Sequence, residues 1–228
     1  LMSRKVKSTL SVVASRGLHS KLTYTRASQA TRTSETGLVE LVSSGEIRLD
    51  YEPGKEFVGT HIGWLLEEAS RNNLLHSEDF TSEWDQITVN ETNIGSVTSD
   101  STRSPDGNNN ADFLKATAGT GVVAVKQSIS FSNGNNYVVS VFAKKGNNAD
   151  YLEISNHDNA TTGRTFSQTF NLNTGATGSS GGTVDSAKIK GYSNGWYRCE
   201  VTFTADTDTA DFVYLKARND DAVSTTGT

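Results

Sequence analysis

The feature that most constrains this 228-residue sequence is a two-residue alternation of apolar and polar side chains through its second two-thirds. In residues 122–131 the apolar side chains fall on odd positions: Val123, Val125, Ile129 and Phe131. In residues 196–204 the odd positions are again apolar, and one of them is Cys199, the single cysteine. Successive side chains of a strand point to opposite faces, so each segment predicts a strand with one buried face. Cys199 is therefore predicted to be a core residue rather than a reactive thiol, and no intrachain disulfide can form.

Further segments with the composition of β-strands are bounded by Asn, Gly and Asp clusters, which favour turns. They are residues 87–89, 113–114, 137–142, 151–154, 164–172, 184–190 and 211–217. The turn Ser132-Asn133-Gly134-Asn135 predicts a hairpin between 122–131 and 137–142, because Asn-Gly tolerates positive φ. The sequence thus predicts an all-β fold, a two-sheet antiparallel jelly-roll sandwich over residues 74–228.

Residues 1–73 lack the regular alternation of the later part, and their short apolar clusters predict a small irregular and β-rich attachment region. Short apolar clusters at 38–42 and 47–51 indicate short strands, and Glu52-Pro53-Gly54-Lys55 indicates a turn. Residues 64–69 are the best helix candidate, at one or two turns.

Charge is distributed unevenly along the chain, whose net charge is −5. The first 26 residues hold six basic side chains and no acid. They are Arg4, Lys5, Lys7, Arg16, Lys21 and Arg26. A basic arm on an acidic remainder fits docking to a negatively charged partner or, equally well, a solvated tail. Nucleic-acid binding is not expected, because Tyr24 is the one aromatic side chain among these charges and no known motif accompanies them.

The sequence also bears on targeting. No apolar run reaches the roughly 18 residues that a membrane-spanning helix needs. The first 13 residues lack the continuous apolar stretch and cleavage site of a signal peptide, so we expect a soluble protein that is not secreted by that route.

Three patterns that would indicate catalysis are weak. Residues 178–182 satisfy Gly-x-Ser-x-Gly, but they lie in a predicted Gly/Ser-rich loop rather than at a strand-to-helix turn. The acidic pairs Glu67-Glu68 and Glu78-Asp79 are adjacent in sequence, and adjacent side chains do not face each other as a glycosidase pair must. The four histidines lack metal-type spacing. We expect no enzymatic activity and no cofactor.

Several ordered motifs resemble the tail-fibre and head-fibre proteins of tailed bacteriophages that carry a jelly roll like a carbohydrate-binding module. The most specific stretch runs from Gly63-Trp64-Leu65-Leu66 through Asn73-Leu74-Leu75-His76-Ser77 to Trp84. Ser104-Pro105-Asp106-Gly107 and the run Asn194-Gly195-Trp196-Tyr197-Arg198-Cys199 follow in the same order as in that family. Together the resemblance covers about residues 22–217.

The resemblance implies a virion structural protein, assembled in the host cytoplasm. It would be a homo-oligomer, with the trimer common in fibres as one form, that displays its sandwich for host-surface adhesion. Family members usually close the sandwich with a further strand that contains a Trp-Gly-Ala-Gln-like run, which this sequence lacks. Either the sequence is truncated or a longer protein continues beyond it. If the strand is absent, the resemblance implies an open sheet edge that a neighbouring subunit could complete. Alternatives are a capsid-decorating subunit that binds no sugar, a polysaccharide depolymerase and a secreted carbohydrate-binding module.

A sugar site requires exposed aromatic rings beside polar side chains. The candidates are Trp84, Tyr151, Tyr192, Trp196 and Tyr214, each of which alternatively packs in the sandwich or at a subunit contact. Jelly-roll binding modules often hold a structural calcium ion, for which Asp106, Asp112 and Asp158 are weak candidates beside the alternative of ordinary turns.

Overall fold

The computed structural model describes residues 23–52, 61–65, 71–89, 96–115, 122–147, 149–156, 166–205 and 209–221. The chain divides into two compact units, Leu1–Glu68 and Ala69–Thr228. The predicted boundary after residue 73 lies five residues beyond this division. Every strand pair in both units is antiparallel, so the all-β prediction is confirmed.

The first unit contains two short two-stranded sheets. Strand β1 (Ala30–Thr33) pairs with β2 (Val39–Val42), and β3 (Leu49–Tyr51) pairs with β4 (His61–Trp64). Buried Arg48 joins the two sheets, because its Nη1 donates to the Thr31 carbonyl at 3.1 Å.

The helix predicted over residues 64–69 is wrong at its start. Trp64 is the last residue of β4, and the Leu65 N–H continues the extended pairing by donating to the Arg48 carbonyl at 2.9 Å. Residues 66–69 lie outside the described residues.

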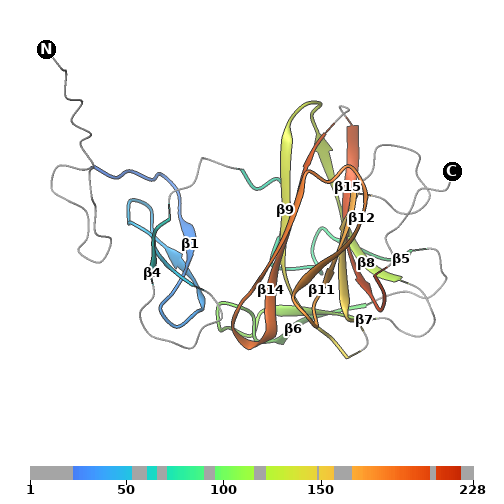
Figure 1. Cartoon of the computed structure of the whole chain (residues 1–228), viewed down its shortest axis with the longest axis horizontal. Helices are drawn as coiled ribbons and strands as arrows, with labels where there is room; N and C mark the ends of the chain where they lie inside the picture. Colours follow the sequence, from blue (N-terminus) through green and yellow to red (C-terminus); the bar gives the residue numbers. More distant parts are fainter. Residues whose placement is uncertain are drawn as a thin grey trace, which may run out of the picture. The chain divides into compact units, whose positions relative to one another are not determined.

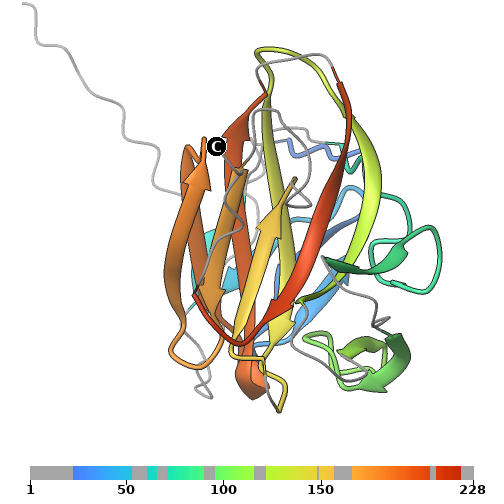
Figure 2. The same cartoon turned by 90° about the vertical axis from the view of Figure 1, so that its right-hand side faces the viewer.

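The second unit is a β-sandwich (Figures 1 and 2). One sheet has six strands in the order β12-β11-β10-β15-β8-β5, and the other has three in the order β13-β14-β9. Their bounds are β5 Asp85–Val89, β8 Val122–Phe131, β9 Asn136–Lys144, β10 Tyr151–Ser155, β11 Phe166–Asn171, β12 Ala176–Gly182, β13 Ser186–Gly191, β14 Trp196–Thr204 and β15 Thr209–Arg218. The two-sheet sandwich is thus as expected, while the jelly-roll order of connections stays a prediction.

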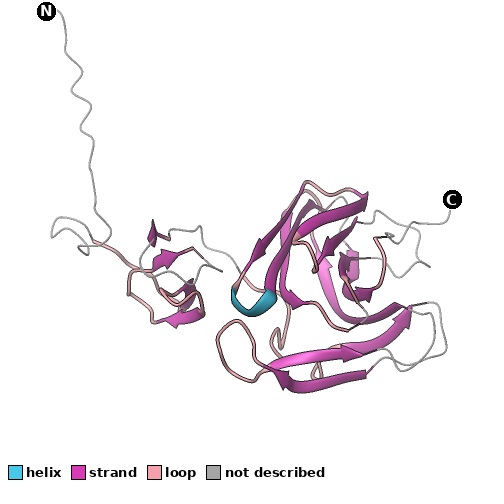
Figure 3. Cartoon of the chain, turned by 60° about the horizontal axis from the view of Figure 1, so that its bottom comes forward, coloured by secondary structure: helices cyan, strands magenta, loops and turns pink. Residues whose placement is uncertain are grey.

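A separate hairpin of β6 (Ser96–Thr102) and β7 (Ala111–Lys115) belongs to the same unit. One 3-10 turn at Ser193–Gly195 is drawn as the cyan segment of Figure 3. Within the part of the chain that the structure describes, no helix is long and apolar enough to cross a membrane.

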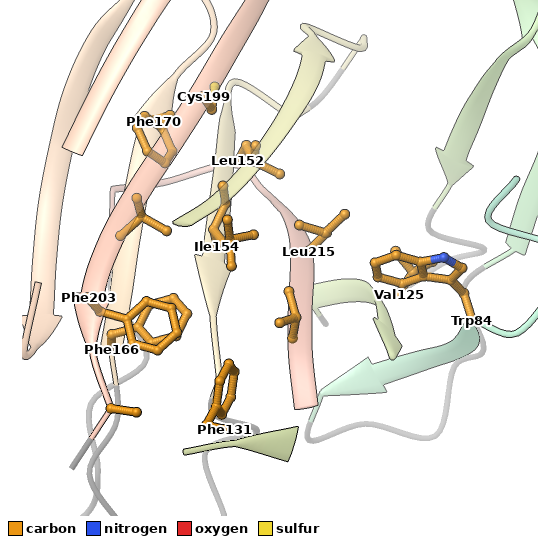
Figure 4. Packing of buried hydrophobic residues seen from close by; sticks show 14 of the residues in the cluster. Trp84, Val125, Phe131, Leu152, Ile154, Phe166, Phe170, Cys199, Phe203 and Leu215 are labelled. Atoms are coloured by element: carbon orange, nitrogen blue, oxygen red, sulfur yellow. The ribbon is translucent and has the colours of Figure 1, made fainter. Parts of the chain in front are cut away.

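The core lies between the two sheets and follows the alternation seen in the sequence (Figure 4). Phe166 from the six-stranded sheet stacks on Phe203 from the three-stranded sheet, with ring centroids 4.0 Å apart. Phe131 meets Phe203 edge to face at 5.3 Å. Cys199 is fully buried in the same cluster, near Phe170 in Figure 4, and this burial raises its pKa to about 12. The prediction that it is a core residue is confirmed.

The predicted hairpin between residues 122–131 and 137–142 is wrong. Strand β8 pairs with β15 and β5, whereas β9 pairs with β14 in the other sheet. Gly134 has the expected positive φ of 77°, but its N–H donates to the Ala205 carbonyl at 2.7 Å. The turn therefore carries the chain from one sheet to the other across the core. The alternation in β8 and β9 could not reveal this, because a strand buries its apolar side in the same way whether the next strand pairs with it or lies in the facing sheet.

Candidate functional site

The five aromatic candidates for sugar binding occupy three different environments. Trp84 is only 6% exposed and packs in the core, where its ring meets Phe80 edge to face at 5.0 Å. Trp196 is 7% exposed, and its Nε1 donates to the Arg103 carbonyl at 3.0 Å. Neither ring presents a face to solvent, so both are withdrawn as sugar contacts in favour of the packing alternative.

Tyr151 and Tyr214 lie on the outer face of the six-stranded sheet, opposite its core-facing side. Tyr214 is buried at 2% exposure and is withdrawn for the same reason, while Tyr151 is half-buried. Tyr151 pairs in register with Arg218, and Tyr214 pairs with Ser155. Lys126 approaches the ring of Phe212 at 4.2 Å on this same side.

The centre of this six-strand outer face is a buried charged cluster. Glu153 accepts hydrogen bonds from Lys216 Nζ at 3.1 Å, Arg218 Nη1 at 2.8 Å and Ser167 Oγ at 2.8 Å. Burial alone would raise the pKa of Glu153, but the cations Lys216 and Arg218 and the Ser167 hydroxyl outweigh it and lower the pKa below 4.5. The cluster is internally satisfied and buried, which fits a structural role.

Asp221 ties the end of the described chain to the edge strand of this sheet. Its carboxylate accepts from the Ser179 N–H at 2.8 Å, from Ser179 Oγ at 3.1 Å and from the Thr169 hydroxyl. The hydrogen bond from Thr169 does most to lower the pKa of Asp221; slight burial opposes it, and the hydrogen bonds from Ser179 act in the same direction as that from Thr169. Gly178 permits this approach, because a Cβ there would lie 2.1 Å from Asp221 Oδ1.

The Gly-x-Ser-x-Gly segment lies in this edge strand, β12, and not in a loop as predicted. Its central Ser180 pairs in register with Gln168 of β11. The Gly/Ser run could not be recognised as a strand because it lacks an apolar alternation. An extended strand does not create the sharp turn that the hydrolase pattern needs.

Asp79, from one of the two acidic pairs, is held in a local turn. It accepts from Thr81 Oγ1 at 2.5 Å, from Ser82 Oγ at 2.7 Å and from the Thr81 N–H at 2.9 Å. These hydrogen bonds lower its pKa from 3.8 to about 2. Glu67 and Glu68 lie outside the described residues.

Most of the outer face of the three-stranded sheet is open, although Trp196 at one end of it is buried, and we call the open part the basic–aromatic face. Ala187 and Ile189 pack toward the core, so the even-numbered side chains of β13 point outward. The outward positions include the apolar Val138, the aromatic Phe142, Tyr192 just after β13, and the polar or charged side chains Ser140, Lys144, Lys188, Lys190, Arg198 and Glu200. Figure 1 shows β9 and β14 side by side in this sheet.

Two half-buried aromatic rings and one guanidinium define the centre of this face. Phe142 and Tyr192 meet edge to face, with centroids 5.0 Å apart. Arg198 lies directly opposite Phe142 in the register of β14 and β9, and Lys190 lies on its other side. One row across three strands therefore reads Lys190, Arg198, Phe142, and it spans about 10 Å.

Arg198 is oriented by two neighbours. Its Nη1 lies 2.7 Å from Glu200 Oε2, and its Nη2 donates to Ser140 Oγ at 3.2 Å. The side chain remains 40% exposed, so the guanidinium also faces solvent. An exposed ion pair adds little stability, so its main effect here is to hold the planar fork in one direction.

The two calcium candidates that the structure describes both use their oxygens in hydrogen bonds within the protein, Asp106 in a turn and Asp112 from strand β7. Asp106 accepts from the Asn108 N–H at 2.8 Å and from the Ser104 hydroxyl. Asp112 accepts from the N–H groups of Phe80 at 2.8 Å and Asp100 at 3.1 Å. Asp158 lies outside the described residues, among which no three His, Cys, Asp or Glu side chains gather as a metal site.

Burial and hydrogen bonding act in opposite directions on the Asp106 carboxyl. Partial burial acts to raise its pKa, whereas the hydrogen bonds from Ser104, Asn108 and Asn110 lower it, and they prevail. These contacts match the ordinary-turn alternative for this residue.

Of the six basic residues assigned to particle docking, only Arg26 is described. Its guanidinium donates to the carbonyls of Val42 and Glu46, each at 3.2 Å, and also to those of Ser28 and Ser43. Arg26 therefore holds a loop of the first unit together, and its docking assignment is withdrawn. Arg4, Lys5, Lys7, Arg16 and Lys21 lie outside the described residues.

Comparison with protein families and with curated proteins identified no relative of this chain: no protein-family model matches it, and no curated protein matches it either.

Proposed function

We propose that this protein is a non-enzymatic structural subunit of a tailed-bacteriophage particle, and that its β-sandwich binds glycans of the host surface. The observation that carries the binding part is the basic–aromatic face, where the Phe142 and Tyr192 rings stand beside an oriented Arg198. Aromatic rings pack on the apolar face of a sugar, while Arg, Ser and Glu side chains hydrogen-bond its hydroxyls.

The virion part rests on the ordered motifs that resemble phage fibres, including the run Asn194–Cys199. That run forms the 3-10 turn and the start of β14, so it shapes one end of the proposed binding face. A fibre subunit repeats its site in every copy. Weak single-site binding then becomes strong through avidity, and a shallow open face suffices for adhesion.

The test is binding of the purified chain to an array of bacterial surface polysaccharides. The wild-type protein should bind at least one glycan, and Tyr192→Ala should lose most of the signal because it removes one of the two aromatic rings of the face. Val138→Ala is the matched control, since Val138 is 57% exposed on the same face and its removal leaves the aromatic pair intact. Equal losses in both variants would contradict the proposed site.

The same bound glycans separate adhesion from degradation. Incubation should release no reducing ends, whereas release of oligosaccharide would favour the depolymerase alternative. Labelled antibody against the chain, imaged on particles, distinguishes a tail or head fibre from a capsid-decorating subunit. Failure to find the chain on any particle would overturn the virion part of the proposal.

A further inference from the structure

We infer that the ligand of the basic–aromatic face is an acidic polysaccharide whose carboxylates pair with Arg198 and the lysines around it. This inference rests on the proposed glycan-binding function and narrows its ligand class. The evidence is the sign of the charge on this face, the fixed direction of one guanidinium and the kind of ring contact beside it.

The charge of this face opposes that of the chain. Its outward strand positions hold four cations and one anion, a net charge of +3, whereas the whole chain carries −5. The residues are Lys144, Lys188, Lys190, Arg198 and Glu200. Lys188 is 75% exposed, so its ammonium is available to a ligand. A cationic surface on an acidic protein attracts anions selectively.

The anion nearest the centre does not neutralise this face. Glu200 lies 2.7 Å from Arg198 and 3.9 Å from Lys188, and its side chain is only 17% exposed. Asp185 precedes β13 and accepts from the Thr204 hydroxyl at 2.8 Å, at the end of β14 away from Trp196. The cations therefore dominate around the aromatic pair.

The geometry favours a carboxylated sugar chain. A guanidinium fork binds a carboxylate through two parallel hydrogen bonds, and holding it in place beforehand lowers the cost of binding. Phe142 lies next to Arg198 in the same row, so one sugar unit can place its carboxylate at the fork and its apolar face near the ring. Lys188 and Lys190 are one outward step apart, about 7 Å, and can meet further carboxylates along the chain.

Single-stranded nucleic acid fits this face less well. Nucleic-acid grooves combine dense positive charge with several exposed ring faces, on which successive bases stack. Phe142 and Tyr192 instead meet at an interplanar angle of 89°, so they do not form a parallel stacking platform. Glu200, in the middle of the cations, can accept a hydrogen bond from a sugar hydroxyl, a donor that the phosphate groups of a nucleic-acid backbone do not offer.

The experiment compares polygalacturonate and hyaluronate with their methyl esters, which keep the sugar backbone and remove the charge. Binding of the full chain to the free acids should be at least tenfold tighter than to the esters, and it should weaken between 50 and 500 mM salt, which screens exposed charges. Arg198→Met should lose roughly ten- to hundredfold in affinity for the acids and little for the esters. Arg198→Lys should recover part of this loss, because it keeps the charge without the fork.

Lys115→Met is the matched control, because Lys115 is exposed on the β6–β7 hairpin, outside this face. It removes the same charge and should leave binding unchanged. Thermal unfolding of every variant separates a lost contact from a lost fold.

The outcomes distinguish this inference from the proposed function. Equal binding to acids and esters overturns the acidic-ligand inference and leaves glycan binding intact. Binding on the array to neutral glycans only has the same consequence. Failure on the array and with all polymers overturns both. Tighter binding to an oligothymidylate than to any polysaccharide also overturns both, in favour of nucleic acid.

Discussion

Lys216 donates to Glu153 at 3.1 Å, and neither side chain has any exposed area. The two residues are directly paired in the register of β15 and β10, in the interior of the six-stranded sheet. Arg218 adds a second contact to the same carboxylate at 2.8 Å. A one-residue slip of β15 would turn these cations toward the apolar core, so the cluster helps to specify the register of the sheet.

Removal of one partner of this pair should be strongly destabilising. We expect Lys216→Met to lower the free energy of unfolding by about 3–5 kcal/mol, because Glu153 would stay buried with less compensating charge. The double variant Glu153→Gln/Lys216→Met should recover part of that loss. Denaturant unfolding measures both. Lys145→Met is the control, since its pair with Asp150 is partly exposed at 38% and 43% and should contribute less than about 1 kcal/mol. Similar losses for the buried and exposed pairs would contradict this account.

Glu153 should also make stability depend on pH. Its pKa in the folded protein is lowered below 4.5 by Lys216, Ser167 and Arg218, against the effect of burial. Its stabilising contribution is therefore fully present above about pH 4.5 and is lost as the pH falls through the folded-state pKa. Glu153→Gln should be less stable than wild type at pH 7, and the gap should narrow toward acid. Unfolding curves at several pH values test this, and a gap that widens toward acid would show the opposite sign.

Cys199 should resist thiol reagents in the native protein. It is fully buried, and burial raises its pKa to about 12, so almost no thiolate is present at neutral pH. We expect labelling by a chromogenic disulfide reagent only in denaturant, with one thiol per chain since the sequence has one cysteine. Rapid labelling of the folded protein would place Cys199 outside the core.

Gly178→Ala should loosen the edge strand β12. The added Cβ would lie 2.1 Å from Asp221 Oδ1 and 2.5 Å from Thr169 Oγ1, closer than atoms can approach. Asp221 must then leave the Ser179 N–H, and we expect a loss of about 1–3 kcal/mol. Gly146→Ala is the matched control, because its new Cβ would meet only Phe113 at an ordinary 3.7 Å. Hydrogen exchange of the Ser179 amide should rise in the first variant and stay unchanged in the second.

The strands with the clearest alternation could be predicted from the sequence. The segment 196–204 forms β14 with the predicted bounds, and its inward residues Cys199, Val201 and Phe203 are buried. Strand β12 could not be predicted, because Gly and Ser carry no apolar signal and its pairing depends on β11 and Asp221. The same holds for β6, because Val97 is the only apolar residue of that strand and gives no alternation.

Candidate site residues were harder to place than strands. The sequence identified Tyr192 as an aromatic that could bind sugar, but Phe142 and Arg198 were not selected. The sequence predicts only that Phe142 lies in one strand and that Arg198 lies on the polar side of another. Only the pairing of β14 with β9 puts these two side chains next to each other.

The amino-acid order alone determined which side of each alternating strand avoids water, because a period of two commits every second residue to the same face. It thereby determined the all-β class and the burial of Cys199. The tertiary structure alone determines which strands pair and which strands face each other across the core. The alternation of β8 and β9 is compatible both with a hairpin and with strands in opposite sheets. The tertiary structure chose the second arrangement through long-range contacts such as Phe166 with Phe203, and in doing so it assembled the basic–aromatic face.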